Sequence, residues 1–203
     1  MNAGHLEILV EEPSMEAFLR ELLPRMLGDK VSFEIYPFQC KDDLLSKLSS
    51  RLRGYSAWLP ADWRIVVVVD RDNEDCYKLK QRLDDIVLRE GLRTRSSGSA
   101  RWQVVNRIAI EELEAWYFGD WDAVKHIYPR VSANVPQKEA FRDPDAISGG
   151  TWEAFERLMK KAGYFEGGLR KIEAARQLGR QIDWQRNSSL SFQYFRDAVL
   201  EVM

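Results

Sequence analysis

Apolar and polar positions follow strand-like and helix-like spacings in turn through the first two thirds of the chain. Apolar runs of strand length lie at residues 6–10, 31–35, 65–69 and 102–110. Between these runs, apolar residues recur at spacings of three and four, as on one face of an amphipathic helix. Strands that alternate with helices predict an α/β fold with a Rossmann-like, mainly parallel sheet flanked by helices.

Single residues indicate where some of these elements begin and end. The mostly β-branched run at residues 65–69 is typical of a central strand buried on both faces of a parallel sheet. We expect a helix over about residues 74–90, with Gly91 as its C-terminal cap. We also expect Ser14 to cap the first helix and Pro24 to kink or end it.

The last third of the chain has another pattern. Prolines and a Gly-Gly pair mark residues 129–150 as a loop-rich stretch without a strand run. Helical spacing then returns around residues 152–161, 169–178 and 192–202, and the polar turn at 187–191 can cap the last helix. These segments predict a set of helices that packs on the α/β core.

Composition narrows the class of protein. The 203 residues are 45% hydrophobic and 31% charged, which is typical of a globular chain. We expect an α/β domain over residues 1–125 and a loop-rich, helical C-terminal extension over residues 126–203. No apolar run approaches the roughly 20 residues of a bilayer span and no leader pattern opens the chain, which favours a cytoplasmic protein without a membrane partner. The net charge of −2 disfavours coating of nucleic acid by bulk electrostatics, although a local basic patch is compatible with it.

Several kinds of catalytic site are disfavoured by the scarcity of cysteine and histidine. There are two of each, without zinc-ligand spacing and without an evident nucleophile beside a histidine. The phosphate-binding motif of P-loop proteins is also absent from the sequence. Any chemistry is therefore expected to rest on carboxylates.

Carboxylates follow the predicted strands. Glu11 follows the first strand, and Asp70 and Asp72 follow the most hydrophobic one. Ligands of open α/β sheets bind outside the carboxyl ends of the strands, so these acids should converge on one edge, where Asp70 and Asp72 can flank a shared ion while Arg71 points away. Crowded carboxylates and hard oxygen ligands suit Mg²⁺ or Mn²⁺. The alternative is that Asp72 or Asn73 only caps the next helix.

A second group of acids follows the fourth predicted strand, with Asp120 beyond it. A helix over residues 111–118 would place Glu111 and Glu114 on one face and turn Glu112 aside. Acids in a first helical turn also favour the helix dipole, which is the structural alternative for this group.

An arginine cluster surrounds the loop at residues 96–99. It is either a contact surface for a nucleic-acid substrate or a solvated helix end. Its members are Arg89, Arg93, Arg95, Arg101 and Arg107.

The order of these motifs resembles a known domain. A strand ending in Glu, a helix, and a β-branched strand ending in Asp-x-Asp look like the TOPRIM domain of primases, topoisomerases and overcoming-lysogenization-defect nucleases. More closely, the chain resembles a bacterial TOPRIM-like family of unknown function that is often encoded beside AAA- or ABC-type ATPases. The matching segments are residues 9–14, 69–76, 110–120, 143–145, 169–173 and 187–192.

The resemblance implies roles for individual residues. Glu11 matches the TOPRIM glutamate, which acts as general acid, general base or metal ligand. Asp70 and Asp72 match the Asp-x-Asp that binds divalent metal. A nucleic-acid substrate would then be contacted by members of the arginine cluster, among them Arg95 and Arg101.

Other matches come from later in the chain. Glu112, Glu114 and Asp120 match a third acidic motif of the family, with Glu112 and Glu114 as further metal ligands. Lys171 matches a lysine that could balance phosphate charge, although a solvated helix lysine is the alternative. In one departure, Glu12 stands where a glycine commonly follows the TOPRIM glutamate, which could crowd an approaching phosphate.

These features predict a Mg²⁺-dependent TOPRIM-type nuclease. It would hydrolyse phosphodiester bonds as the effector of a partner ATPase in defence against phage or plasmids, as a monomer or a homo-oligomer. A different class is a non-catalytic TOPRIM-like subunit that binds and regulates the ATPase. This alternative is motivated by Glu12 and by aromatic residues expected to be exposed, which are Trp116, Tyr117, Trp121 and Trp152.

A third class is a phosphatase of the haloacid-dehalogenase-like kind, with Asp70 as covalent nucleophile. An Asp-x-Asp after an apolar strand also fits these enzymes. They usually continue the pair with Thr or Val, whereas Asn73 and Glu74 follow here.

Overall fold

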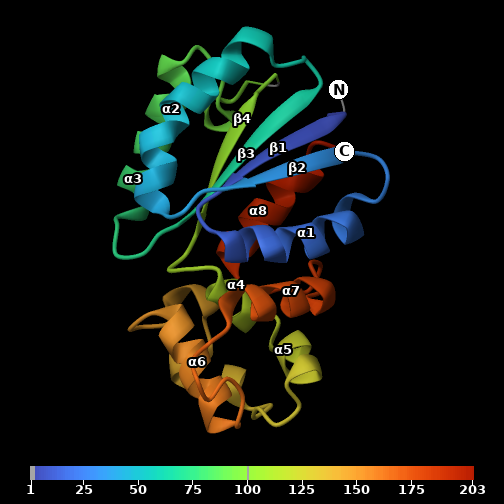
Figure 1. The fold of residues 1–203 in the computed structure, drawn as a ribbon, viewed down its shortest axis with the longest axis vertical. Coiled ribbons are helices and arrows are strands. Elements are labelled where there is room, and N and C mark those ends of the chain that lie inside the picture. Colours follow the sequence, from blue (N-terminus) through green and yellow to red (C-terminus); the bar gives the residue numbers. More distant parts are fainter. Residues whose placement is uncertain (1–2, 100) are drawn as a thin grey trace.

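The computed structural model describes residues 3–99 and 101–203 of the chain. Its centre is a four-stranded sheet in the order β2-β1-β3-β4, in which all neighbouring strands are parallel (Figure 1). This confirms the predicted α/β fold with a parallel, Rossmann-like sheet. The strands are β1 His5–Val10, β2 Ser32–Pro37, β3 Trp63–Asp70 and β4 Val104–Ala109.

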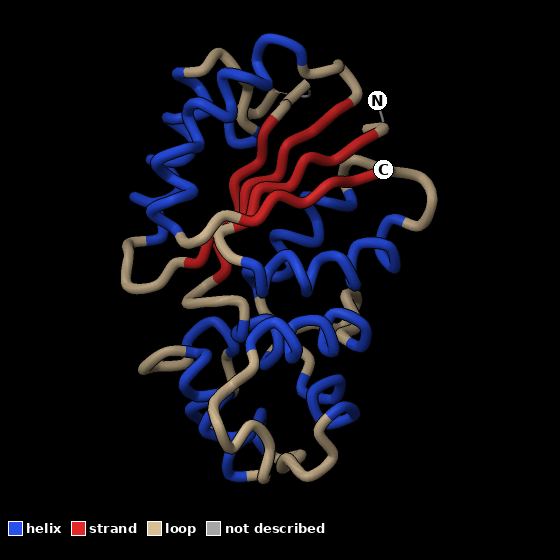
Figure 2. The backbone as a smooth tube through the Cα atoms, in the orientation of Figure 1, coloured by secondary structure: helices blue, strands red, loops and turns tan. Residues whose placement is uncertain are grey.

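Helices cover both faces of this sheet. The α1 helix (Pro13–Leu27) lies on one face, and α2 (Lys41–Trp58) and α3 (Cys76–Arg89) lie on the other (Figure 2). Side chains alternate along each strand, so Ile8 joins the core on the α1 face and Leu9 joins the core on the α2 face. The sheet is therefore buried on both sides, as its β-branched strands predict.

The first helix begins two residues earlier than a Ser14 cap predicts. Pro13 is its first residue, so Ser14 lies inside the helix and the predicted Ser14 cap is wrong. Proline suits this position because the first helical N–H groups have no partner within the helix. The helix also continues past Pro24, as far as Leu27.

The third helix has a different cap from either candidate in the sequence. The Asp75 carboxylate accepts a hydrogen bond from the Lys78 N–H, so neither Asp72 nor Asn73 caps this helix. At its other end, Gly91 has φ +77°, the left-handed conformation expected of a glycine that ends a helix.

The rest of the chain is helical, without a strand in the described residues after Ala109. In Figure 1 the strands end toward the helical part formed by α4 to α7, while α8 lies against the sheet. The helices are α4 Glu114–Phe118, α5 Trp121–Ile127, α6 Thr151–Lys161, α7 Lys171–Gln181 and α8 Leu190–Leu200, with 3-10 turns η1 Arg95–Ser97, η2 Val135–Gln137, η3 Glu139–Phe141 and η4 Pro144–Ala146.

The helical part and the sheet share one hydrophobic core. Phe18 of α1 packs against Trp116 of α4, and Trp116 stacks on Phe195 of α8 with ring centroids 5.1 Å apart. Packing is therefore continuous across residue 125, and a division into domains at that point stays a prediction.

Two of the later sequence motifs hold this core together. Asp145 accepts hydrogen bonds from the Ser189 hydroxyl and from the Ser191 N–H, which fixes the first turn of α8. Asn187 donates to the Trp116 carbonyl at 2.8 Å, and Asp120 accepts from the Asp183 N–H at 2.7 Å. These residues serve the fold rather than a site.

The aromatic residues expected at the surface are mostly buried. Trp116, Tyr117 and Trp121 are at most 5% exposed, and Trp152 is partly buried. The prediction of an exposed aromatic surface from these residues is therefore wrong, because α4 and α5 pack into the shared core. Within the described residues, no helix is long and apolar enough to cross a membrane.

Candidate acidic site at the strand ends

Two acids meet at the switch point of the sheet, between β1 and β3. The chain places β2 on one side of β1 and then β3 and β4 on the other, and such switch points are where open α/β sheets bind ligands. Glu11 directly follows β1, and Asp70 is the last residue of β3. The Asp70 N–H donates to the Glu11 carboxylate at 2.9 Å. The predicted convergence of these two acids is confirmed.

Asp70 is a buried carboxylate in an acidic environment. It is 6% exposed, and its Oδ1 has no hydrogen-bond partner among the described residues. Burial raises the pKa of Asp70 well above its ordinary value, and the nearby carboxylates of Glu11, Glu12 and Glu114 raise it further. A group of this kind is stabilised by any cation that reaches it.

Glu11 and Glu114 share this behaviour. Burial raises the pKa of Glu11 to about 7, against the opposing effects of the Asp70 N–H and Lys41. Burial also raises the pKa of Glu114 to about 7, and Lys171 opposes that shift. The Oε2 of Glu114 is buried without a hydrogen-bond partner in the described part of the chain. Both glutamates can therefore exchange protons near neutral pH.

Lys171, at the start of α7, is a cation that faces this cluster beside Glu114, as Lys41 does beside Glu11. Burial lowers its pKa, but Glu114, Glu12 and Glu112 raise it by more, so the net shift is upward. Its ammonium also lies 5.4 Å from the centre of the Trp152 ring. Lys171 therefore lies beside the acidic cluster, and the phosphate-balancing role that the resemblance implies for it stays a prediction.

The segment after β4 is arranged differently from the predicted helix. Glu111 has φ +57° and α4 begins only at Glu114, so Glu111 and Glu114 do not share a helix face. Glu111 forms an ion pair with Arg71 instead. Glu112 accepts hydrogen bonds from the Thr151 hydroxyl at 3.1 Å and from a backbone N–H of α6 at 3.0 Å. The left-handed turn thus contradicts the predicted helix face of Glu111 and Glu114, and the role of Glu112 as a metal ligand stays a prediction.

Asp72 is also turned away from the predicted position. Its φ of +50° and the hydrogen bond from its N–H to the Glu111 carbonyl place it in a tight turn after β3. Its carboxylate lies 2.5 Å from the Lys41 ammonium, at the start of α2. The turn thus pairs the Asp72 carboxylate with Lys41, and the role of Asp72 as a metal ligand stays a prediction.

Glu12 contributes a carboxylate to the site. It raises the pKa of Asp70 and of Glu114 through charge repulsion, and its side chain accepts a hydrogen bond from Ser14. The backbone at Glu12 has φ −143°, an extended conformation open to any residue, so the turn does not require glycine. Sequence reasoning treats this position only as a departure and misses its charge.

The predicted arginine contacts lie elsewhere. Arg95 pairs with Glu201 at 2.5 Å, and the Arg101 carbonyl accepts a hydrogen bond from Arg93. Both arginines precede β4, at the amino ends of the parallel strands, whereas the acids lie at the carboxyl ends. A strand of this length spans roughly 20 Å. Arg95 and Arg101 are therefore not part of the acidic site.

The donor set fits a divalent cation in its chemistry. Among residues 3–99 and 101–203, no three Asp, Glu, His or Cys side chains are placed to hold one ion together. Mg²⁺ does not require three, because it is commonly held by one or two carboxylates together with water and substrate phosphate. The free oxygens of Asp70 and Glu114 are hard donors of this kind.

The fold and this site define a Rossmann-like α/β protein with an acidic cluster at the switch point of its sheet. The chain belongs to the family described as a domain of unknown function (DUF4276), whose model matches residues 10–200. The match includes the acidic cluster and Lys171. No curated protein and no solved structure matches the chain.

The acidic cluster should make stability depend on pH. A carboxyl whose pKa is raised on folding stabilises the folded state below its ordinary pKa, and this contribution is lost as the pH rises through the raised value. For Glu11 and Glu114, the loss falls between about pH 4.5 and about pH 7. We expect the free energy of unfolding in EDTA, measured with urea, to be lower at pH 8 than at pH 5.5.

The control is the double variant Glu11→Gln and Glu114→Gln. Glutamine has the same size but does not titrate, so the stability of this variant should change much less between the two pH values. An unchanged pH dependence in the double variant would show that other groups cause it.

Proposed function

We propose that this protein is a Mg²⁺-dependent nuclease of the TOPRIM type, which hydrolyses phosphodiester bonds at the acidic cluster. The observation that carries the proposal is the pairing of Glu11 with the buried, under-bonded Asp70 at the switch point of the sheet. The role as effector of an ATPase in defence against phage or plasmids rests on the order of the sequence motifs. Nucleic acid and the ATPase are the proposed partners.

The surroundings of each acidic side chain suggest its proposed role in the reaction. Asp70 and Glu114, which have free buried oxygens, would hold the ion, whereas the Glu112 carboxylate accepts hydrogen bonds from Thr151 and Trp152. The bound ion would supply positive charge to the phosphate. Glu11 has a pKa of about 7 and is only partly buried, so it can accept the proton of an attacking water near neutral pH.

Lys171 is placed to hold the phosphate. Its ammonium interacts with Glu114, Glu12 and Glu112, and its raised pKa keeps it charged at neutral pH. A cation in this position offsets the repulsion between the acids and the phosphodiester, which the net negative charge of the cluster would otherwise disfavour.

Cleavage assays on labelled single-stranded DNA, duplex DNA and RNA, with Mg²⁺, Mn²⁺ or EDTA, test the proposal. Glu11→Gln should reduce the cleavage rate by about a hundredfold or more, the range for loss of a proton-transfer group. Asp70→Asn should also reduce it strongly, because it removes a proposed ligand of the ion. Glu111→Gln is the matched control, because Glu111 pairs with Arg71 and should leave the rate nearly unchanged. Cleavage that persists in both site variants would refute the assignment.

A second candidate is the non-catalytic subunit that binds and regulates an ATPase. The observation that favours it is Lys171, since an ammonium that already faces the acids reduces their need for a metal ion. Calorimetry with Mn²⁺ separates the two candidates. Absence of binding, together with stable co-purification with the ATPase, would support the regulatory subunit over the nuclease.

A further inference from the structure

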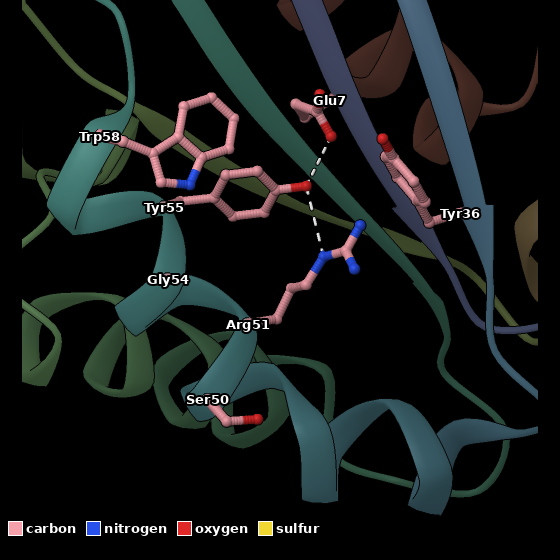
Figure 3. Close-up of a pocket in the computed structure, with 7 residues that line it drawn as sticks. All are labelled: Glu7, Tyr36, Ser50, Arg51, Gly54, Tyr55 and Trp58. Atoms are coloured by element: carbon pink, nitrogen blue, oxygen red, sulfur yellow. Dashed lines mark hydrogen bonds between the residues drawn. The ribbon is translucent and has the colours of Figure 1, made fainter.

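A pocket lies between α2 and the edge of the sheet, away from the acidic cluster (Figure 3). It has a volume of about 320 Å³. In Figure 3, Tyr55 and Trp58 of α2 stand on one side, Tyr36 of β2 stands on the other, and Glu7 of β1 lies between them. The pocket is therefore walled by aromatic rings and has a carboxylate at its base.

The polar groups of this pocket are held in fixed positions. Glu7 is 4% exposed and accepts a hydrogen bond from the Tyr55 hydroxyl at 2.5 Å. The Arg51 guanidinium lies 4.3 Å from the centre of the Tyr36 ring, and its Nε donates to the Tyr55 hydroxyl at 3.4 Å. Trp58 is 55% exposed, so much of its ring remains free for contact.

A second hollow extends the pocket along the same edge of the sheet. It shares Tyr36 and Arg51 with the pocket and has a volume of about 650 Å³. It continues past Phe38 and Lys47 to Pro13, which is two residues after Glu11. We call the two hollows together the α2–β2 groove, and it leads from Glu7, in the middle of β1, along the end of β2 toward Pro13.

The groove combines planar surfaces with little net charge. Lys47 is paired with Asp43 at 2.5 Å, which leaves Arg51 as the main cation among the lining residues. Binding here would therefore come more from stacking on Tyr36 and Trp58 than from neutralised phosphates. Proteins hold unpaired bases by stacking them on aromatic side chains beside cationic groups that contact the backbone, and here the aromatic rings are the larger part and Arg51 supplies the cation.

We propose that the α2–β2 groove binds a single strand of nucleic acid, with one base stacked in the Trp58 pocket and the backbone following β2 toward Glu11. A base in a duplex is stacked and paired, so it would have to leave the helix to enter this pocket. This inference rests on the proposed function, because it names the substrate class of the acidic site.

Fluorescence anisotropy with a fluorescein-labelled oligothymidylate of 12 nucleotides tests the groove. The Glu11→Gln protein in EDTA is used, so that cleavage does not interfere. Trp58→Ala and Arg51→Ala should each weaken binding by about tenfold, the effect of losing one stacked base or its supporting cation. Arg53→Ala is the matched control on the same helix, because Arg53 pairs with Glu90 outside the groove and should leave binding within about twofold.

Two further measurements sharpen the result. A duplex of the same length should bind at least about tenfold more weakly than the single strand. The affinity should fall only gently with salt, with a log–log slope of about −1 for one or two phosphate contacts. The proposal would be overturned if the Trp58→Ala and Arg51→Ala variants bound the oligonucleotide as tightly as the Glu11→Gln protein does. It would also be overturned if the duplex bound as tightly as the single strand.

The same proteins separate this inference from the proposed function. Groove-dependent binding of the oligonucleotide without cleavage in any metal would leave the groove assignment standing and refute the nuclease. Cleavage of single strands that is unchanged by Trp58→Ala and Arg51→Ala would support the nuclease and refute the groove.

Discussion

The Asp70→Asn variant is expected to be more stable than the parent protein in EDTA at pH 8, although the same change should strongly reduce the proposed cleavage. Asp70 is buried among other carboxylates, and its raised pKa means that folding at pH 8 must either bury a charge or take up a proton. Asparagine keeps the shape and removes that penalty. The gain should be on the order of 2 kcal/mol, within the range for neutralising buried charges.

The size of this gain in stability depends on pH. The penalty in the parent protein begins above the ordinary Asp pKa of 3.8 and increases as the pH rises. The stability difference between Asp70→Asn and the parent should therefore be small at pH 4 and largest at pH 8. In thermal unfolding, about 2 kcal/mol corresponds to roughly 4–8 °C for a chain of this size.

Asp72→Asn is the matched control for this prediction. Asp72 is exposed and paired with Lys41, so its neutralisation should not raise the melting temperature. If Asp70→Asn melts at or below the parent temperature in EDTA, the crowding of the acids is not a source of instability. A residue that lowers stability but is needed for cleavage is what a functional site leads us to expect.

Strands and their terminal acids could be predicted because both depend on local pattern. The β-branched run of β3 can be buried only in the middle of a sheet, and parallel strands bring Glu11 and Asp70 to one edge. Helix caps were less predictable. Ser14 and Asp75 are both reasonable caps by residue type, and only the neighbouring Pro13 and the turn after Asp70 decide between candidates.

The positions of the acids that surround Glu11 and Asp70 could not be predicted from their spacing in the sequence. Asp72 and Glu111 both adopt left-handed backbone conformations, which redirect the side chains that follow. Helical spacing over residues 111–118 therefore predicts a shared face for Glu111 and Glu114 that the structure does not have, whereas the resemblance names Glu112 and Glu114. Charge repulsion involving Glu12 depends on the approach of α1 to α4, a tertiary contact without a local signal.

The location of Arg95 and Arg101 in the fold also could not be predicted from local sequence. Clustering in the sequence indicated a common surface, but it could not indicate which end of the sheet that surface occupies. The parallel strand β4 decides the matter, because residues before it lie at the amino ends and residues after it lie at the carboxyl ends. The groove beside α2 was missed for a related reason, since Glu7, Tyr36 and Trp58 come from three separate elements.

Gly179→Ala is expected to cause one of the largest losses of stability in the chain. Gly179 lies in α7 where this helix crosses α1, and a Cβ added there would lie 2.4 Å from the Phe18 carbonyl oxygen and 3.1 Å from the Glu21 Cβ. The crossing is fixed further by Arg25, which donates to the Gly179 carbonyl at 2.9 Å. A backbone atom cannot move aside as a side chain can, so the two helices must separate.

The loss should be about 2–3 kcal/mol, the range for forcing an added group into a packed interface, and roughly 4–12 °C in melting temperature. Gly54→Ala in α2 is the control with the same change, because a Cβ there meets no atom within 4 Å. In a helix interior that substitution stabilises by about 0.5–1 kcal/mol, so the two variants should shift the melting temperature in opposite directions. A Gly179→Ala protein as stable as the parent would mean that α7 does not pack on α1 this closely. The position of Lys171, which begins the same helix, would then lose its structural support.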